Sequence, residues 1–223
     1  GRNPRPGEIT LAHRGVLFLD EMPEFSRRSL EILRQPLEDK VIRISRVYGT
    51  YDFPADFMLC AAMNPCPCGH YPDMNRCRCT PAQVMQYLGR ISQPLLDRLD
   101  LCAEVSPVDF EGLSSGRKGE STQTIRERVI CAQDIQRERY KIEGIQFNGE
   151  LSGAQIEKYC KMEKDARQLL KMAFQNMPFS ARAYHRILKV ARTIADMEAT
   201  ESIHRHHIAE ALSYRAFDKK YWN

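Results

Sequence analysis

Three short apolar runs punctuate the first half of the chain. They are VLFLD (16–20), FMLCAAMN (57–64) and LDLCAEV (99–105). Runs of this length that end at charged or turn-forming residues are typical of buried strands. Amphipathic stretches separate them, and strands that alternate with helices indicate an α/β sheet. The sequence therefore predicts three buried strands in an α/β arrangement.

The segments between these runs carry the signals of two helices and a hairpin. Ser26 can cap a helix that continues to about Glu38, with leucines at helical spacing along one face. Residues 41–57 predict a hairpin with residues 48–50 at or near its turn. A second helix is expected to start at residues 80–83, where a capping threonine, a proline and a glutamine follow in the favoured order.

After residue 121 the pattern becomes helical throughout. The capping serines are Ser121, Ser152, Ser180 and Ser202, and Gln155 completes a capping box with Ser152. The apolar stripes are Ile125 and Val129; Ile156, Tyr159 and Cys160; and Ile187, Val190, Ala191 and Ile194. We expect these stripes to form the core of a bundle of about four or five helices.

The change of pattern defines the predicted domains. Residues 1–110 are expected to form part of an α/β core, residues 111–121 a linker, and residues 122–223 an all-α helical domain. The opening GRNPRPGEIT reads as the continuation of an earlier segment, so we expect a piece of a longer protein.

Composition narrows the class further. The chain has 223 residues, of which 43% are hydrophobic and 28% charged, and this is typical of a globular protein. The net charge of +4 does not by itself indicate a nucleic-acid partner. No run has the length of a membrane span, and residues 1–10 lack the apolar region of a signal peptide, so we expect a cytoplasmic protein.

The run VLFLD delivers two adjacent carboxylates, Asp20 and Glu21. In P-loop NTPases an acid at the end of a buried strand holds Mg²⁺ near the phosphates, and a neighbouring carboxylate can take a proton from an attacking water. Asn64 follows the next apolar run, where an amide can hold that water or contact a γ-phosphate. The structural alternative is that each strand simply ends in a turn, at Met22-Pro23 and at Asn64-Pro65.

Two arginines are candidates for phosphate binding. Arg98 lies between Asp97 and Asp100 in LLDRLDL, either as a local ion pair or as an arginine finger offered to a neighbouring subunit. Arg182 lies in the first turn of a predicted helix, where the helix dipole disfavours a cation. Phosphate binding would explain its position, and solvent exposure is the alternative.

Eight cysteines in a reducing compartment point to a metal before disulfides. Two C-x-C pairs bracket a loop in CPCGHYPDMNRCRC, and they predict a tetrahedral zinc site with His70 as an alternative ligand. The paired cysteines are Cys66, Cys68, Cys77 and Cys79. Free thiols, or disulfides formed in air, are the other interpretation. The remaining Cys60, Cys102, Cys131 and Cys160 stand in apolar surroundings and are expected in the core.

The predicted hairpin carries Arg43 and Arg46, with Tyr48 and Tyr51 at its tip. Cations with interleaved aromatic residues suit a nucleic-acid backbone and stacked bases, although many surface hairpins share this composition. GLSSGRKGEST (112–122) contains glycines and a lysine but not the G-x-x-x-x-G-K-[ST] order, and that motif occurs nowhere in this sequence.

Together these motifs resemble one family. PGEITLAHRGVLFLDEMPEFSRRSLEILRQPLED, AAMNPCPCG, LLDRLDL and SARAYHRILKVARTIADME are similar to segments of the ComM (YifB) group of Mg-chelatase-like AAA+ ATPases, over nearly the whole chain. The resemblance implies a Walker B pair, with Asp20 serving Mg²⁺ and Glu21 activating water, and sensor 1 at Asn64. It further implies an arginine finger at Arg98 and a sensor 2 arginine at Arg182.

The resemblance also sets expectations for the whole molecule. It implies a partial AAA+ core followed by a helical lid domain, hexameric rings, ATP with Mg²⁺, and branch migration of DNA in recombination of imported DNA. The hairpin resembles a pre-sensor 1 insertion that points into the ring pore. Because the Walker A half is absent from this sequence, we expect the chain alone neither to bind ATP tightly nor to hydrolyse it. The alternatives are a magnesium chelatase ATPase subunit and a non-catalytic, zinc-stabilised DNA-binding or adaptor module.

Overall fold

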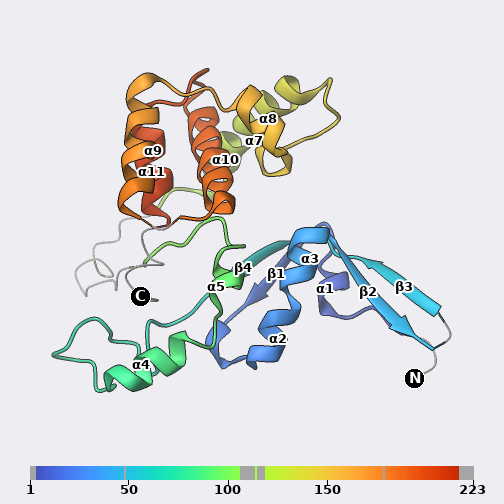
Figure 1. The fold of residues 1–223 in the computed structure, drawn as a ribbon, viewed down its shortest axis with the longest axis vertical. Coiled ribbons are helices and arrows are strands. Elements are labelled where there is room, and N and C mark those ends of the chain that lie inside the picture. The colour runs from blue at the N-terminus through green and yellow to red at the C-terminus, as the bar shows by residue number, and fades with distance from the viewer. Residues whose placement is uncertain (1–3, 48, 106–113, 115–118, 178, 216–223) are drawn as a thin grey trace. The chain divides into compact units, whose positions relative to one another are not determined.

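The structure is a computed structural model that describes residues 4–47, 49–105, 114, 119–177 and 179–215. The chain divides into two compact units (Figure 1). The division falls between Leu99 and Asp100. Each unit has its own apolar core. The predicted linker at 111–121 lies largely outside the described residues, so its boundaries stay a prediction.

The first unit combines short helices with two small sheets. Its elements are α1 (Glu8–Leu11), β1 (Val16–Leu19), η1 (Met22–Glu24), α2 (Arg27–Ile32), α3 (Arg34–Asp39), β2 (Val41–Arg46), β3 (Gly49–Pro54), β4 (Met58–Ala61), α4 (Pro81–Leu88) and α5 (Gln93–Leu96). Strand β1 pairs in parallel with β4, from Val16 opposite Met58 to Leu19 opposite Ala61. This pair confirms the parallel α/β arrangement expected from the alternation of strands and helices.

The helix predicted over residues 26–38 is interrupted. Ser26 caps it as expected, because its side chain accepts the Ser29 N–H at 3.1 Å. The helix then breaks at Leu33 into α2 and α3. Pro36 explains the break, since it has no N–H to donate to the carbonyl of Ile32. The leucine face is retained, and Leu30 and Leu33 are buried.

The predicted hairpin is confirmed as the antiparallel pair β2–β3, from Val41 opposite Pro54 to Arg46 opposite Gly49. Its turn begins at Val47, next to the predicted residues, and Tyr48 lies outside the described residues. Tyr51 is not at the tip, because it sits within β3 opposite Ile44.

The expectation of fully buried strands is wrong for one face of the β1–β4 sheet. Leu17 and Leu19 pack against the core of the first unit. Val16 and Phe18 alternate with them and are each 58% exposed, and Met58 is 66% exposed. Successive side chains of a strand point to opposite faces, so a two-stranded sheet with a core on one side leaves the other face open.

The third predicted strand, 99–105, does not form. Residues 101–105 have no regular secondary structure, and Val105 is 89% exposed. The Cys102 N–H donates to the carbonyl of Tyr214, the C-cap of the last described helix, at 3.1 Å, so this amide is not paired with a strand.

The second unit is helical, as predicted. Its described residues form five α-helices and a 3-10 turn: α7 (Thr122–Tyr140), η2 (Asn148–Glu150), α8 (Gly153–Tyr159), α9 (Lys164–Asn176), α10 (Ala181–Met197) and α11 (Arg205–Ser213). Ser121 and Ser180 cap α7 and α10. Ser152 donates its N–H to Gln155 Oε1 at 2.9 Å ahead of α8.

Ser202 is not a cap, which corrects the fourth serine prediction. Helix α11 begins three residues later, with His204 at its N-cap. The intervening Ile203 is held extended by backbone hydrogen bonds to Lys161 and Glu163 on the neighbouring segment, at 2.8 and 3.1 Å. The chain therefore cannot turn into a helix at Ser202.

The apolar stripes of α8 and α10 form the core of this unit, with Ile156, Cys160 and Ile187 buried. The stripe of α7 does not, because Ile125 and Val129 are 42% and 41% exposed. All described side chains from Ser121 to Cys131 are exposed. The first half of α7 therefore contributes no buried side chain to the core of this unit. The core prediction also fails for two cysteines: Cys60 and Cys131 are exposed. Cys102 is only partly buried.

Candidate functional site

The acid pair and Asn64 lie at the same edge of the β1–β4 sheet. The parallel pairing continues past the strands, because the Ala62 N–H donates to the Leu19 carbonyl at 2.9 Å and the Met22 N–H donates to the Ala62 carbonyl at 3.0 Å. The carboxyl ends of neighbouring parallel strands meet at one edge, where ligands bind in open α/β sheets. The structure thus brings together the two segments that the sequence singled out.

Glu21 occupies a left-handed backbone conformation, with φ 48°. Such a conformation is uncommon for a residue other than glycine and costs free energy on the order of 1 kcal/mol. The turn buries Met22 and Pro23 in the core while Asp20 and Glu21 stay exposed. The Glu21 N–H donates to Asp20 Oδ1 at 2.9 Å and orients that carboxylate. Both acids are therefore presented to solvent from a fixed turn.

Asn64 is exposed and lies beside the cysteine loop. A Cβ atom placed on Gly69 would lie 3.9 Å from both Cγ and Oδ1 of the Asn64 side chain. Gly69 has φ 80°, in the region that favours glycine, and its N–H donates to the Cys66 carbonyl at 3.0 Å. The turn from Cys66 to Gly69 thus lies close to the Asn64 side chain.

Arg98 is paired within the first unit. Its side chain is 10% exposed, with an ion pair to Glu38 and a hydrogen bond from Nη1 to the Pro94 carbonyl at 2.6 Å. Neither flanking acid is its ion-pair partner, since Asp97 accepts from Gln93 and Asp100 pairs with Arg186. The sequence suggested an ion pair with a neighbouring acid, but Arg98 instead pairs with Glu38, 60 residues earlier in the chain.

Arg182 belongs to the second unit and is exposed in the first turn of α10. Ser180 caps this helix by accepting the Ala183 N–H at 3.1 Å. The cap satisfies one backbone donor of the first turn.

The hairpin arginines differ from each other. Arg43 donates from Nε and Nη2 to the two oxygens of Asp52, at 2.9 and 3.0 Å. Hydrogen bonding to Arg43 lowers the pKa of Asp52. Arg46 is exposed at the end of β2 and forms no ion pair with the described residues. Arg46 is therefore the hairpin cation whose charge is available to a partner.

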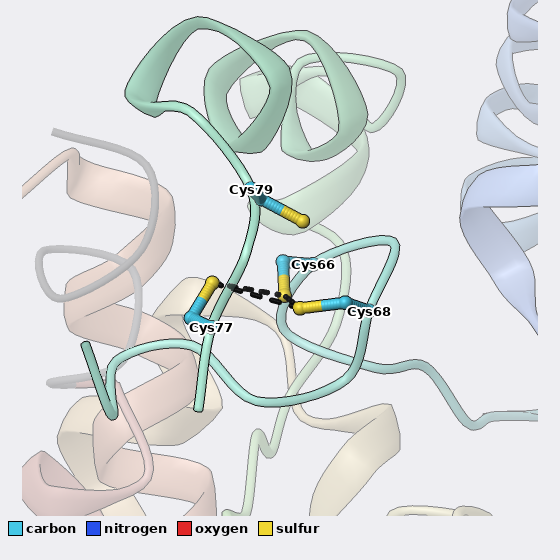
Figure 2. Close-up of side chains that lie close together, drawn as sticks. All are labelled: Cys66, Cys68, Cys77 and Cys79. Atoms are coloured by element: carbon cyan, nitrogen blue, oxygen red, sulfur yellow. Dashed lines mark hydrogen bonds between the residues drawn. The ribbon is translucent and has the colours of Figure 1, made fainter. Parts of the chain in front are cut away.

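The four clustered cysteines lie close together (Figure 2). Their sulfur atoms all lie within 4.8 Å of one another, and three separations are 3.4, 3.6 and 3.8 Å. A tetrahedral zinc ion with Zn–S bonds of about 2.3 Å requires sulfur separations of about 3.8 Å. No pair is bonded as a disulfide. The arrangement fits a zinc site made by four thiolates, and His70 is not part of the converging group.

The electrostatics of the cluster favour a bound cation. Backbone hydrogen bonds from His70 and Arg78 lower the pKa of the Cys68 thiol to about 6. Burial, together with the neighbouring sulfurs of Cys68 and Cys66, raises the pKa of Cys79 to about 12. One thiolate is thus stabilised by the fold, and further deprotonation is opposed until a positive ion balances the charge.

A second polar group was missed from the sequence, although the run HRHH at 204–207 could have signalled it. His206 Nε2 and His207 Nε2 lie 2.9 and 3.0 Å from the same oxygen of Glu198. His207 Nδ1 accepts the His204 N–H at 2.9 Å, so the His207 proton resides on Nε2 and donates to Glu198. His207 is therefore engaged as a helix cap and does not offer a free lone pair to a metal.

The fold and the site define the class of protein. A parallel strand pair that ends in two acids and an asparagine, followed by a helical unit, is the architecture of a partial AAA+ ATPase core with its helical lid. The family model "Magnesium chelatase, subunit ChlI" matches residues 1–113, and its C-terminal counterpart matches residues 119–215. The chain belongs to this magnesium chelatase family of AAA+ ATPases, within the ComM/YifB group.

Relatives from three bacteria support that placement. An uncharacterised protein YifB of Salmonella typhimurium is 48% identical over 221 residues, or 98% of this chain, and YifB of Escherichia coli is 46% identical over the same length. The competence protein ComM of Haemophilus influenzae is 48% identical over 217 residues, or 97% of this chain. The chain spans 42% of the length of each of these relatives. Within the described part of the chain, no helix is long and apolar enough to cross a membrane.

Proposed function

We propose that this chain carries the residues of an ATPase nucleotide site that bind Mg²⁺ and activate the attacking water. The ATPase is proposed to remodel DNA by branch migration during recombination of imported DNA. The observation that carries the proposal is the parallel pairing of β1 and β4. It places Asp20, Glu21 and Asn64 just after the carboxyl ends of two neighbouring strands. The similarity to a relative named as a competence protein, ComM, supports this role. The cytoplasmic location remains a prediction.

In this proposal each polar group has a separate task. Asp20, oriented by the Glu21 N–H, offers a carboxylate oxygen of the kind that Mg²⁺ prefers. Magnesium bound with ATP would neutralise charge on the phosphates. Glu21 accepts a proton from the attacking water, and the Asn64 amide orients that water. The left-handed turn keeps both acids exposed to a nucleotide.

Two arginines complete the proposed site. Arg98 acts as the finger toward a neighbouring subunit of a hexameric ring, and Arg182 as the sensor that links nucleotide to the helical unit. In the structure Arg98 is paired with Glu38, so its action in trans requires exchange of that carboxylate for phosphate. A partly exposed Glu38 permits such an exchange, since its side chain is 44% exposed.

The cysteine cluster is proposed to hold zinc in a structural role. Four thiolates leave no open coordination position, which is the character of a structural site and not of a catalytic one. Because Gly69 lies against Asn64, the metal would fix the loop that borders the asparagine. Arg46 on the hairpin, together with Arg43, is proposed to approach the DNA backbone.

The test is ATP-dependent branch migration of a labelled four-way DNA junction by a protein of the relatives' full length. The parent is expected to convert the junction to duplex products only with ATP and Mg²⁺. Asp20→Asn should stop conversion and leave junction binding unchanged, because the acid contributes to the nucleotide site alone. Conversion by Asp20→Asn at the parental rate would refute the assignment of Asp20.

Two alternatives remain distinct. The preformed four-cysteine cluster would equally suit a non-catalytic, zinc-stabilised DNA-binding or adaptor module. That alternative predicts junction binding without any ATP-dependent conversion. The matching family model is named for a magnesium chelatase subunit, so a chelatase ATPase role is the other alternative. It predicts ATP hydrolysis that does not respond to DNA.

A further inference from the structure

The outer side of the cysteine loop forms a basic hollow. It has a volume of about 480 Å³ and is lined by Cys68, His70, Asn75, Arg76 and Arg78. Among the described residues no carboxylate lines it, although Cys68, one of the four clustered cysteines, does. Its size falls within the range of small-ligand sites, roughly 300–1,000 Å³. None of these residues belongs to the proposed nucleotide site or to the hairpin.

Arg78 lines the hollow, whereas the cysteines on either side of it, Cys77 and Cys79, do not. Along residues 77–80 the side chains alternate, so Cys77 and Cys79 are partly buried while Arg78 is exposed. An extended chain places successive side chains on opposite sides. The same short segment therefore contributes thiols to one side and a guanidinium to the other.

The hollow is held in shape by the cluster behind it. Arg78 stands between two of the converging cysteines, and its backbone hydrogen-bonds Cys68. The backbone of His70 also forms a hydrogen bond to the Cys68 sulfur. These contacts fix both arms of the loop, and a binding group fixed in advance loses less entropy when a ligand binds.

The positive charge of the hollow is available to a ligand. Arg78 forms no ion pair with any other residue in the described ranges. Arg76 has one long contact, 3.8 Å to Asp73, and its side chain is 73% exposed. Exposed pairs of this kind contribute little, so a phosphate can replace the carboxylate. Guanidinium groups match phosphate oxygens with two parallel hydrogen bonds.

We infer that this hollow binds a phosphodiester of a nucleic-acid backbone, as a second contact apart from the hairpin. The inference goes beyond the proposed function, because it needs neither ATP nor an intact nucleotide site. Phosphate contacts position a protein on nucleic acid without reading sequence. The loop would therefore hold the strand in place irrespective of its bases.

The experiment measures binding of a fluorescein-labelled oligothymidine strand to this chain by anisotropy, over a series of salt concentrations without nucleotide. Each phosphate contact to a single strand contributes about 0.7 to the salt slope, which is about a factor of 5 in Kd at 0.1 M salt. Arg78→Ala should weaken binding about 5-fold and Arg76→Ala/Arg78→Ala about 25-fold, with slopes lower by about 0.7 and 1.4. Arg78→Lys should retain most of the affinity. Arg28→Ala, an exposed arginine on α2 outside the hollow, should match the parent.

Three outcomes would overturn the inference. The first is a double variant with the parental Kd and slope, and the second is a parent that does not bind the strand at low salt. The third is displacement of the strand by inorganic phosphate at equal phosphate concentration, which would assign the hollow to free phosphate. Zinc content is measured on every variant. Zinc loss with unchanged Kd is a case of the first outcome and would show that the arginines balance the thiolate charge instead.

An alanine variant that loses both zinc and binding is replaced by Arg76→Gln/Arg78→Gln, which keeps polar side chains of similar reach. Weak binding by a zinc-loaded glutamine variant supports the inference, and parental binding overturns it. Failure here is distinguishable from failure of the proposed function. The present assay contains no ATP, whereas the proposed function fails through the loss of ATP-dependent junction conversion.

Discussion

Asp196→Ala should destabilise the helical unit strongly, because this carboxylate is the only acid in a buried cluster of described residues. Its side chain is 0% exposed and accepts from Arg139 Nη1 at 2.9 Å, Arg192 Nε at 3.1 Å and Asn148 Nδ2 at 2.9 Å. Arg192 is equally buried, and burial lowers its pKa. Removal of the carboxylate leaves two guanidinium groups without their counter-charge.

The magnitude follows from that burial. Removal of one partner from a buried charge pair costs about 3–5 kcal/mol. Two contacts moderate the loss, since Arg192 also donates to the carbonyls of Thr200 and Glu201. We therefore expect about 3 kcal/mol for Asp196→Ala in the free energy of unfolding. Asp196→Asn keeps the shape but not the charge and should lose a similar amount.

The assay is urea unfolding of the chain, followed by far-ultraviolet circular dichroism. The matched control is Asp134→Ala on α7, which removes an ion pair to Arg137 at 3.0 Å whose side chains are 63% and 52% exposed. Such an exposed pair contributes about 0–1 kcal/mol. Equal stability of Asp196→Ala and Asp134→Ala, with an unchanged urea slope, would refute the reasoning about burial.

Three further predictions concern metal, pH and capping. The chain purified without added zinc should contain about one zinc ion per molecule by elemental analysis, and Cys77→Ser should contain far less; a metal-free parent would contradict the site. Hydrogen bonds from Lys158 and then Tyr159 lower the pKa of Glu143 to about 2 from 4.5, so its stabilisation is full above pH 4.5 and is lost as the pH falls through 2. Glu143→Gln should flatten the fall in unfolding free energy over that window, and an unchanged acid limb would count against the pair. Thr80→Ala removes the cap at Gln83 N and should cost about 1 kcal/mol in urea unfolding, compared with a neutral Met85→Leu change on the exposed face of α4.

Local signals in the sequence predicted most of the fold. Caps at Ser26, Thr80 and Ser121 were identified correctly, because a side-chain oxygen near a backbone N–H is a short-range interaction. The hairpin was also correct, since its turn and strands are adjacent in the chain. The interruption at Leu33 could have been predicted from Pro36, which removes a helix hydrogen bond.

Long-range contacts account for what the sequence did not reveal. The 99–105 run has the composition of a strand, yet its Cys102 amide pairs with Tyr214, more than 100 residues away. The exposure of Phe18 depends on which strands and helices surround β1. Similarly, the sequence could not show that Arg98 pairs with Glu38, because no local pattern links a residue of α3 to the end of α5.

The candidate sites show the same division. The convergence of four cysteines was predicted because their C-x-C spacing is itself the signal. The adjacency of the acid pair and Asn64 rested on the pairing of two strands, which the structure provides. The contact of Gly69 with Asn64 had no counterpart in the sequence pattern, because it depends on the left-handed turn at Gly69.

The most direct test compares ATP binding with ATP hydrolysis for Glu21→Gln in a protein of the relatives' full length. Glutamine has the shape of glutamate but cannot take a proton from water. We predict unchanged affinity for a fluorescent ATP analogue and a loss of hydrolysis of about 100-fold or more. Hydrolysis at the parental rate, with ATP bound, would contradict the assignment of the β1–β4 edge as the hydrolytic site.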